Sequence, residues 1–448
     1  MTGEPARDPT AVRRSPLVGL LSAATVSVFG IAMSALAIPW LVLTMTGSAV
    51  DTGLVAFAEL GPYVLLQVLI GPVVDRVGAR KACMWGNAVA AAAICVIPVL
   101  SATGSIHLVL VVAVVVVVGS ARGIADCATT VLVPGTAASA GVSLERAAGM
   151  FAGATRAGQL LGPPAAGVLV AAVGSPTVIL VNGVTFASAA VLIAALVPGS
   201  ALVSGSAQLP TAAVGARRQS YGGQLSEGLR FLRADRLLLG IVAVIAVTNL
   251  LDQGMNSVLI PVWIRQGGHS PAALGLIAGA MGGGALVGNL VGAWLGPRLP
   301  RRLTLTIGLI FGCAPRYAVL ALASTFPPIL VVTVLAGCVG GAINPIIGAV
   351  LYERVPPRLQ ARVLGTVKAS AWIGMPFGAL FAGLLSGTVG LRAALLGAAA
   401  VALIVTAAPL FFPAWKDLGR ARGPAEPPPR EADAEPVAPE HNLPGPGR

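Results

Sequence analysis

Charged residues are scarce in this sequence: Asp, Glu, Lys and Arg make up 10% of its 448 residues, whereas a soluble domain contains about 25%. The shortage extends along the whole chain, and apolar stretches of about 20 residues recur from Leu17 to Phe412. As a helix, each stretch is long enough to cross roughly 30 Å of hydrocarbon. The stretches do not alternate polar and apolar residues, so membrane-spanning strands are not expected. The sequence therefore excludes a soluble protein and predicts an all-α integral membrane protein.

Cysteine and histidine, two residue types that bind metals, are also few. The five cysteines lie within or beside apolar runs, without metal-ligand spacing or a disulfide framework, and a buried thiol there behaves as a small hydrophobic side chain. The three histidines stand far apart in the chain. No G-x-x-x-x-G-K-[ST] segment occurs, so no ATP-driven engine is visible. We expect no metal and no cofactor, and a membrane enzyme or a receptor is the least favoured class.

About twelve apolar segments are predicted to span the membrane. They cover 17–45, 52–73, 82–101, 105–128, 147–172, 175–197, 237–264, 271–296, 303–323, 326–350, 364–387 and 390–413. The polar stretch in the middle of the chain separates two sets of six. The predicted domains are an N-terminal tail (1–16), a first bundle (17–197), a central loop (198–236), a second bundle (237–413) and a C-terminal tail (414–448).

The central loop contains a segment with helical periodicity, QLSEGLRFLRADR. It places Leu225, Leu229 and Leu232 on one face, with arginines around them. This pattern predicts an amphipathic helix that lies on the inner leaflet of the membrane, and a plain flexible linker remains the alternative.

Basic residues are distributed unevenly among the predicted loops. Most of the 29 Lys and Arg residues fall on one side of the predicted spans, and Arg265 and Arg392 fall on the other. Cytoplasmic loops of membrane proteins are enriched in Lys and Arg, so both termini are predicted to be cytoplasmic. The net charge of +12 is thereby explained without a nucleic-acid partner.

The two sets of spans share an internal repeat. Ile38-Pro39 recurs as Ile260-Pro261, and Gly53-Leu54 recurs as Gly275-Leu276 at the same offset. The charged turn GPVVDRVGARK at 71–81 matches GAWLGPRLPRR at 292–302, with Arg80-Lys81 near Arg301-Arg302. Parallel repeats of this kind are found in transporters whose substrate site lies near the membrane midplane between the halves.

Two motifs resemble those of the major facilitator superfamily, and the resemblance covers 15–415. The loop after the second span follows the family pattern G-x-x-x-D-R-x-G-R-R except at Ala79, through Gly71, Asp75, Arg76, Gly78, Arg80 and Lys81. The fifth span is similar to the signature of members that export substrates in exchange for protons, except at Ala166. Its matching residues are Gly149, Gly158, Gly162, Pro163 and Gly167.

The resemblance implies the superfamily fold, with twelve transmembrane helices in two six-helix bundles related by pseudo-two-fold symmetry. It also implies a monomer that acts on a small molecule and protons in the lipid bilayer. The chain looks most like the bacterial branch that includes macrolide and siderophore exporters, which places it in the plasma (inner) membrane of a bacterium.

The charged turn is interpreted as a latch at the inner membrane face. Asp75 is expected to accept hydrogen bonds from the N–H groups at the start of the eleventh span, near Leu364, because the family has that helix as its neighbour. Gly71 is expected to allow close helix approach, and Gly78 to supply a turn conformation. The basic residues of the turn would pair with acids or lipid phosphates. A simple positive-inside anchor remains the alternative.

The second copy of the turn has Gly296 where the first has Asp75, so it is interpreted as an anchor. In the fifth span, Gly158 and Gly162 form a face of small residues that lets another helix approach closely. Pro163 and Pro164 are expected to bend the helix and provide a hinge between the bundles. Tight packing without a role in transport is the alternative.

The few charges inside the spans are expected to face the protein interior, because a charge in lipid costs about 2.5–3.5 kcal/mol even on the mildest scale. Glu59, Asp126 and Asp252 are candidate proton carriers, since burial disfavours the charged carboxylate. Arg122 stands one turn from Asp126, so mutual neutralisation with Arg156 as a further partner is the structural alternative. The candidate cavity residues are Arg122, Arg156, Asn249, Gln253 and Asn256; the last three form a stripe with Asp252 at i, i+3, i+4 and i+7.

The function predicted from these features is proton-driven export of a small hydrophobic or amphipathic compound, such as an antibiotic, drug or siderophore-like molecule, by alternating access. The alternative is an importer of a small nutrient or organic acid. The glycine pattern of the fifth span and the scarcity of polar side chains in the first, second and eighth spans argue against import.

Overall fold

The computed structural model describes residues 14–198, 221–295, 298–356 and 359–413, together with Trp415 and Leu418. Within these ranges every regular element is helical, as the sequence predicts. Most of the predicted N-terminal tail, part of the central loop, almost all of the C-terminal tail, and Gly296 lie outside the described residues.

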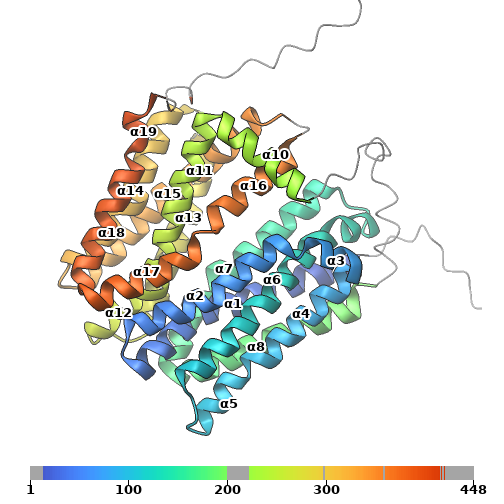
Figure 1. Cartoon of the computed structure of the whole chain (residues 1–448), viewed down its shortest axis with the longest axis horizontal. Coiled ribbons are helices and arrows are strands. Elements are labelled where there is room, and N and C mark those ends of the chain that lie inside the picture. The colour runs from blue at the N-terminus through green and yellow to red at the C-terminus, as the bar shows by residue number, and fades with distance from the viewer. Residues whose placement is uncertain are drawn as a thin grey trace, which may run out of the picture.

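The helices form two bundles (Figure 1). The first consists of α1 (Ser15–Thr46), α2 (Ala49–Leu69), α3 (Gly71–Val77), α4 (Ala79–Ile94), α5 (Val96–Ala102), α6 (Leu108–Ser139), α7 (Leu144–Val173) and α8 (Ser175–Leu196). The second consists of α10 (Tyr221–Ala234), α11 (Arg236–Gly254), the π-helical turn η2 (Met255–Leu259), α12 (Ile260–Gln266), α13 (Ala272–Leu295), α14 (Arg301–Leu322), α15 (Pro327–Arg354), α16 (Gln360–Trp372), α17 (Met375–Thr388), α18 (Leu391–Thr406) and α19 (Ala408–Phe411).

Eleven candidate membrane spans occur among the described residues, judged by length and hydropathy. The predicted fifth span, α7, is not among them, and it carries Glu145, Arg146 and Arg156. It is nevertheless a continuous helix of 30 residues, including Pro163 and Pro164. The all-helical membrane fold is therefore confirmed, while eleven rather than twelve helices meet both criteria.

The ends of the helices define two ends of the molecule. We call the end that holds Ser15, α3, α10 and Arg301 the basic end, because the turn at 71–81, the arginines of α10 and Arg298–Arg302 lie there. The opposite, far end holds the short connections after α1, α7 and α17. Each of these connections contains a glycine with positive φ, namely Gly47, Gly174 and Gly390, a conformation that glycine adopts at little cost.

The same arginine contact closes the basic end of each bundle. Arg80, at the start of α4, donates to the carbonyl oxygens of Ala194 (2.6 Å) and Val197 at the end of α8. Arg302, at the start of α14, donates to those of Pro409 (3.0 Å) and Leu410 (3.2 Å) at α19. A cation at a helix C-terminus satisfies orphan carbonyls and complements the helix dipole. In the structure, Arg302 is therefore the counterpart of Arg80, whereas the sequence repeat aligned Arg80 with Arg301.

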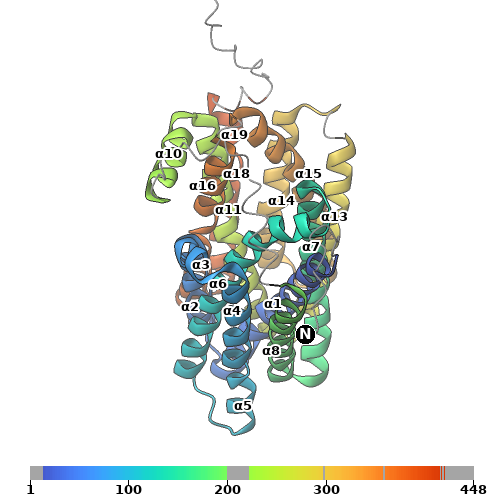
Figure 2. The same cartoon turned by 90° about the vertical axis from the view of Figure 1, so that its right-hand side faces the viewer.

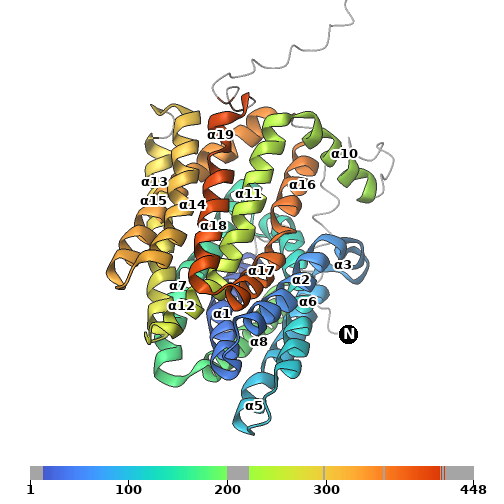
Figure 3. The ribbon, with the colours of Figure 1, turned by 60° about the vertical axis from the view of Figure 1, so that its left-hand side comes forward.

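The bundles contact each other near the far end. There α2 packs against α17, and α7 packs against α13 (Figures 2 and 3). At the seam, a Cβ added to Gly53 would lie 2.5 Å from the carbonyl oxygen of Ala379, and one added to Gly167 would lie 2.7 Å from the Cα of Gly275. Toward the basic end, α10 and α16 separate from α3 (Figure 1).

The helix α10 packs on the second bundle. Leu232 is buried against a cluster from α11, α15 and α16 that includes Leu238 and Val367. Glu227 forms an ion pair with Arg362 of α16. The sequence predicted that Leu232 faces the membrane, but its apolar side chain is instead covered by protein.

Candidate functional site

The charged side chains inside the spans form ion pairs between helices that are far apart in sequence. Arg122 of α6 donates to Glu59 of α2 at 2.7 Å, with both side chains nearly buried. Arg316 of α14 donates to Asp252 of α11, also at 2.7 Å. The structural alternative placed Arg122 beside Asp126, but the direct ion pair of Arg122 is with Glu59, which reaches the guanidinium across the helix interface.

Tyr63 connects the first ion pair to Asp126. The Arg122 guanidinium lies 5.0 Å from the centroid of the Tyr63 ring, a distance typical of a cation–π contact. The Tyr63 hydroxyl donates to Asp126 Oδ2 at 3.1 Å and accepts from Gln67 Nε2 at 3.2 Å. Tyr63 and Gln67 were not predicted as site residues, although Glu59, Tyr63 and Gln67 recur at i, i+4 and i+8 on one face of α2.

The polar stripe of the second bundle is partly engaged by its own neighbours. Asn249 donates to the carbonyl oxygen of Ala371 at 3.1 Å, and Gln253 donates to Ser257 at 2.6 Å. Asn256 is exposed and donates to the backbone oxygen of Asp252 at 2.8 Å. The stripe runs from α11 into the π-helical turn η2, a rare element that often occurs at functional sites. The π-helical turn therefore interrupts the regular α-helical spacing of the stripe before Asn256.

Arg156 does not join the charged groups of α6. It is exposed on α7 and donates to Gln159 at 3.2 Å. In the second bundle, Lys368 is exposed on α16, with its Nζ 4.8 Å from the centroid of the Trp372 ring.

The charged turn adopts α3 followed by Gly78 with a φ of 92°, so Gly78 has the predicted conformation. Asp75 is exposed and forms no hydrogen bond or ion pair with the described residues. The expected contact between Asp75 and the start of α16 is therefore not formed in this conformation. A Cβ added to Gly71 would meet no atom within 4 Å, so the close approach predicted there is also not present.

The glycines of α7 serve two different interfaces. Gly158 and Gly162 face α1 within the first bundle, where a Cβ on Gly162 would lie 2.6 Å from the Cβ of Ala32. Gly167 faces α13 of the second bundle. Gly149 has open space around it. The predicted contact between bundles thus involves Gly167, whereas the small-residue face at Gly158 and Gly162 packs inside one bundle.

A hydrogen bond crosses the seam at the far end. Arg265 of α12 donates to the carbonyl oxygen of Leu43, near the C-terminus of α1. Because a helix C-terminus carries partial negative charge, the cation is well placed there. This contact and the glycine seam hold the far end together.

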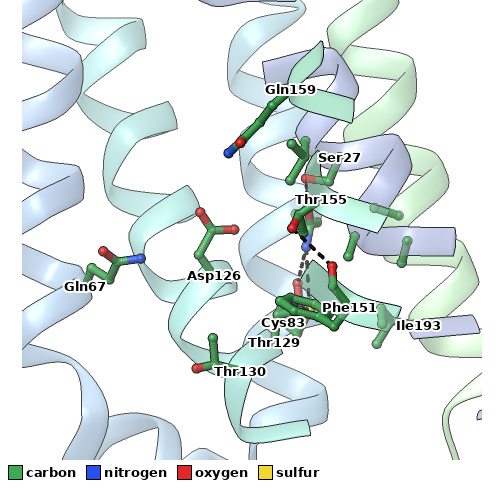
Figure 4. A pocket seen from close by; sticks show the side chains of 15 residues that line it. Ser27, Gln67, Cys83, Asp126, Thr129, Thr130, Phe151, Thr155, Gln159 and Ile193 are labelled. Atoms are coloured by element: carbon green, nitrogen blue, oxygen red, sulfur yellow. Dashed lines mark hydrogen bonds between the residues drawn. The ribbon is translucent and has the colours of Figure 1, made fainter. Parts of the chain in front are cut away.

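The first bundle also contains a pocket of about 190 Å³, lined by both polar and apolar side chains (Figure 4). Asp126 lies at its wall, with Gln67, Thr129 and Thr130 nearby. The remaining lining residues are Ala23, Ala24, Ser27, Val28, Cys83, Asn87, Phe151, Thr155, Gln159, Ala189 and Ile193. Of these lining residues, Gln67, Asp126 and Gln159 also take part in the hydrogen bonds described above.

Two multidrug efflux pumps are similar to this chain over most of its length. The multidrug efflux pump Tap of Mycobacterium tuberculosis is 32% identical over 415 residues, which cover 91% of this chain and 96% of the relative. The multidrug efflux pump Tap of Mycolicibacterium fortuitum is 29% identical over 419 residues, with 93% and 100% covered.

Solved structures share the fold at low sequence identity. A bacterial homologue of the human lysosomal transporter Spinster, in an inward-facing and unoccupied conformation, has a TM-score of 0.69 and 14% identity, and the match covers 93% of this chain and all of that one. The nucleoside transporter NupG has a TM-score of 0.62 and 16% identity, with 89% and 98% covered. The family model described as Major Facilitator Superfamily matches residues 20–251 and again 242–443. The chain therefore belongs to the Major Facilitator Superfamily.

Proposed function

We propose that this membrane transporter exports small hydrophobic or amphipathic drug-like compounds in exchange for protons, by alternating access. The observation that carries the proposal is the packing of the bundles: they are joined at the far end by α2–α17 and α7–α13 contacts and diverge toward the basic end. Two bundles that rock about a central site require such a closed seam at one end in each state. The similarity to multidrug efflux pumps supports a drug-like substrate.

In this proposal the basic end faces the cytoplasm of a bacterium and the chain lies in its plasma (inner) membrane as a monomer. The concentration of arginine at the basic end supports this orientation, because cytoplasmic loops carry an excess of Lys and Arg. The structure then corresponds to a state that takes up substrate from the cytoplasm or from the inner leaflet.

Three carboxylates inside the spans supply sites for the exchanged proton. Glu59 forms an ion pair with Arg122, and Asp252 forms one with Arg316. Asp126 accepts a hydrogen bond from the Tyr63 hydroxyl. Protonation of Glu59 or Asp252 weakens an ion pair between two helices, which is a local change able to shift the balance between two packing states. Substrate binding between the bundles biases the same balance in the opposite direction.

The turn at 71–81 acts as a latch in the opposite state. When the basic end closes, Asp75 approaches the N-terminus of α16 and accepts hydrogen bonds from its exposed N–H groups. Gly167 and Arg265 perform the corresponding task at the far end in the present state, which their contacts with Gly275 and Leu43 support.

Expression in an efflux-deficient bacterium tests the function. We expect the chain to raise the inhibitory concentration of several drugs and to lower dye accumulation, and a protonophore to abolish both effects. Dye accumulation that increases on expression would indicate import. Export that persists after the proton gradient is removed would contradict proton coupling.

A further inference from the structure

A second pocket lies at the far end, where the two bundles meet. The connection from α1 to α2 forms one side of it, and the ends of α12 and α17 form the other. Its volume is about 490 Å³, within the roughly 300–1,000 Å³ of pockets that hold a small organic ligand. Each bundle therefore supplies one side of a pocket that is large enough for a ligand.

The pocket depends on the closed seam. Two of its lining residues, Val50 and Gly387, face each other across the seam, and a Cβ added to Gly387 would lie 2.7 Å from Val50 Cγ2. Nearby, a Cβ added to Gly383 would lie 2.7 Å from the carbonyl oxygen of Ala49. Alternating access parts the bundles at this end in the other state, which separates the two sides of the pocket. An occupant that touches both sides therefore favours the state described here.

Arg265 gives the pocket a positive charge. It donates to the carbonyl oxygen of Leu43 and forms no ion pair with a described residue. A guanidinium has five N–H donors, so most of them are available to a ligand. Among the described residues that line the pocket none is Asp or Glu; Asp51, the acid closest in sequence, lies in the first turn of α2. The charge of the pocket therefore favours an anion.

Two further side chains of the lining offer donors. Ser48 Oγ accepts from the N–H of Asp51 at 3.1 Å, and its own proton is not given to a described residue. The amide of Gln266 forms no hydrogen bond within the described part of the chain. Ser386 differs, because its hydroxyl donates to the carbonyl oxygen of Ala382 at 2.7 Å and is left as an acceptor. The side chains of the wall thus present more donors than acceptors, which suits the oxygens of an anion.

We propose that this pocket binds an organic anion with a small apolar body, such as a carboxylate, sulfonate or phosphate, and that the occupant holds the far end closed. Arg265, Ser48 and Gln266 supply the donors, while Leu43 and Val262 supply apolar surface. The binding does not depend on the proposed export function. Its consequence does: because export requires the far end to open, an anion that enters from outside the cell would inhibit it.

Two naphthalene compounds of similar shape test the site. Naphthalene-1-sulfonate is an anion, and naphthalene-1-sulfonamide is neutral. Their Kd values are measured on the purified full chain in a neutral detergent. Hydrogen bonds to a charged group are roughly twice as strong as neutral ones, so Arg265→Gln should raise the Kd of the sulfonate about tenfold or more. The Kd of the sulfonamide should change less than about twofold by the same scale.

Arg392→Gln is the matched control. Arg392 is the other arginine at the far end; it is exposed at the start of α18 and lies outside the pocket lining. The variant removes the same charge from the same end and should leave the affinity for the sulfonate unchanged. Equal weakening by Arg265→Gln and Arg392→Gln would overturn the proposal, since the overall charge of this end would then account for binding. Unchanged affinity in Arg265→Gln would overturn it too.

A second variant fills the pocket and keeps the arginine. Ser386 is half-buried in the lining, so Ser386→Phe should abolish binding of both compounds, whereas Ser386→Ala should leave the Kd of the sulfonate within about twofold of the wild type. Size-exclusion chromatography confirms that each variant is folded. A folded Ser386→Phe protein that binds the sulfonate as the wild type does would show that the anion sits elsewhere.

Lipid headgroups carry the same anionic chemistry, so the source of the natural occupant is tested separately. The Kd of the sulfonate is measured again after phosphatidylglycerol or phosphatidylcholine is added. Competition by phosphatidylglycerol alone assigns the site to a lipid headgroup, and equal Kd values in both lipids assign it to a soluble anion.

Transport in everted membrane vesicles tests the consequence, because their lumen holds the far end in the proposed orientation. Sulfonate trapped in the lumen should inhibit dye transport by the wild type, and sulfonate added outside should not. Inhibition only from outside would place the anion at the basic end and overturn the proposal. Dye transport that ignores luminal sulfonate would show that the occupant does not hold the far end closed. If the protein binds the sulfonate through Arg265 but transports no dye, the export function is wrong and the anion site stands.

Discussion

The two charged turns differ in what their residues contact. In both copies an arginine, Arg80 or Arg302, holds the last helix of its own bundle. In the second copy the adjacent Arg301 also forms a bidentate pair with Glu353 at the end of α15, at 2.6 and 2.9 Å. In the first copy Asp75 is exposed and unbound by described residues. The repeat thus retains one contact within each bundle, and only the first turn offers an acid to a partner elsewhere.

The basic ends of the two bundles also differ in the ion pairs that they contain. In the second bundle, ion pairs join Arg301 to Glu353, Arg354 to Asp235 and Arg362 to Glu227. The described part of the first bundle has no ion pair at this end. We infer that α10 moves with the second bundle, because the pair with Arg362 and the burial of Leu232 fasten it there.

The largest effect is expected at the seam between the bundles. In Gly167→Leu the new side chain overlaps the backbone of Gly275, so the far end cannot close and transport should fall about 100-fold or more, to background. Vesicle transport together with the amount of folded protein, measured by size-exclusion chromatography, checks this. Gly149→Leu is the control, since Gly149 has open space around it. If Gly167→Leu were as active as Gly149→Leu, the seam would not be required in the cycle.

Each bundle has one ion pair inside its spans, and breaking each pair in turn compares how much it contributes to the stability of the protein. Removing one partner of a buried pair leaves an uncompensated charge and costs about 3–5 kcal/mol. Glu59→Gln leaves Arg122, 10% of whose side chain is exposed, and should cost the lower part of this range. Asp252→Asn leaves Arg316, only 3% of whose side chain is exposed, and should cost more. Thermal unfolding in detergent gives the order, and a larger loss for Glu59→Gln would contradict it.

The difference between the turns predicts unequal results for two acid-to-amide changes. Asp75→Asn should insert normally but reduce transport about tenfold or more, because the variant loses a charged partner at a helix N-terminus worth up to about 2 kcal/mol. Glu353→Gln should alter transport less than about twofold, since an exposed ion pair contributes about 0–1 kcal/mol. Initial rates in vesicles decide between them. Similar rates for Asp75→Asn and the wild type would reduce the turn to a membrane anchor.

The smallest effect should be shared by the two bundles. Arg80→Ala and Arg302→Ala each remove a cation from a helix C-terminus and should each lower stability by about 1 kcal/mol. The two shifts in the melting temperature should agree within error. A shift in only one variant would show that the repeated contact is structural in one bundle alone.

The sequence predicted most of the fold because the length of each apolar segment is read within that segment, and the internal repeat relates the two sets of spans directly. It did not predict the partner of Arg122, because helical spacing favoured Asp126 while Glu59 reaches the same guanidinium from another helix. It also missed Tyr63, since an aromatic residue in an apolar span is usually read as core. The contact surface of α10 depends on tertiary packing, so its apolar face alone did not distinguish membrane from protein.

The seam at Gly53, Gly167 and Gly275 has an energetic consequence. Backbone meets backbone at these glycines, but apolar side chains also pack across the seam, for example Phe57 against Phe377. Each square ångström of apolar surface exposed to water when the bundles part costs about 25 cal/mol. In the proposed transport cycle, contacts that form at the basic end as the seam opens would offset this cost. Protonation of one carboxylate or the binding of one substrate molecule would then be enough to shift the balance between the two states.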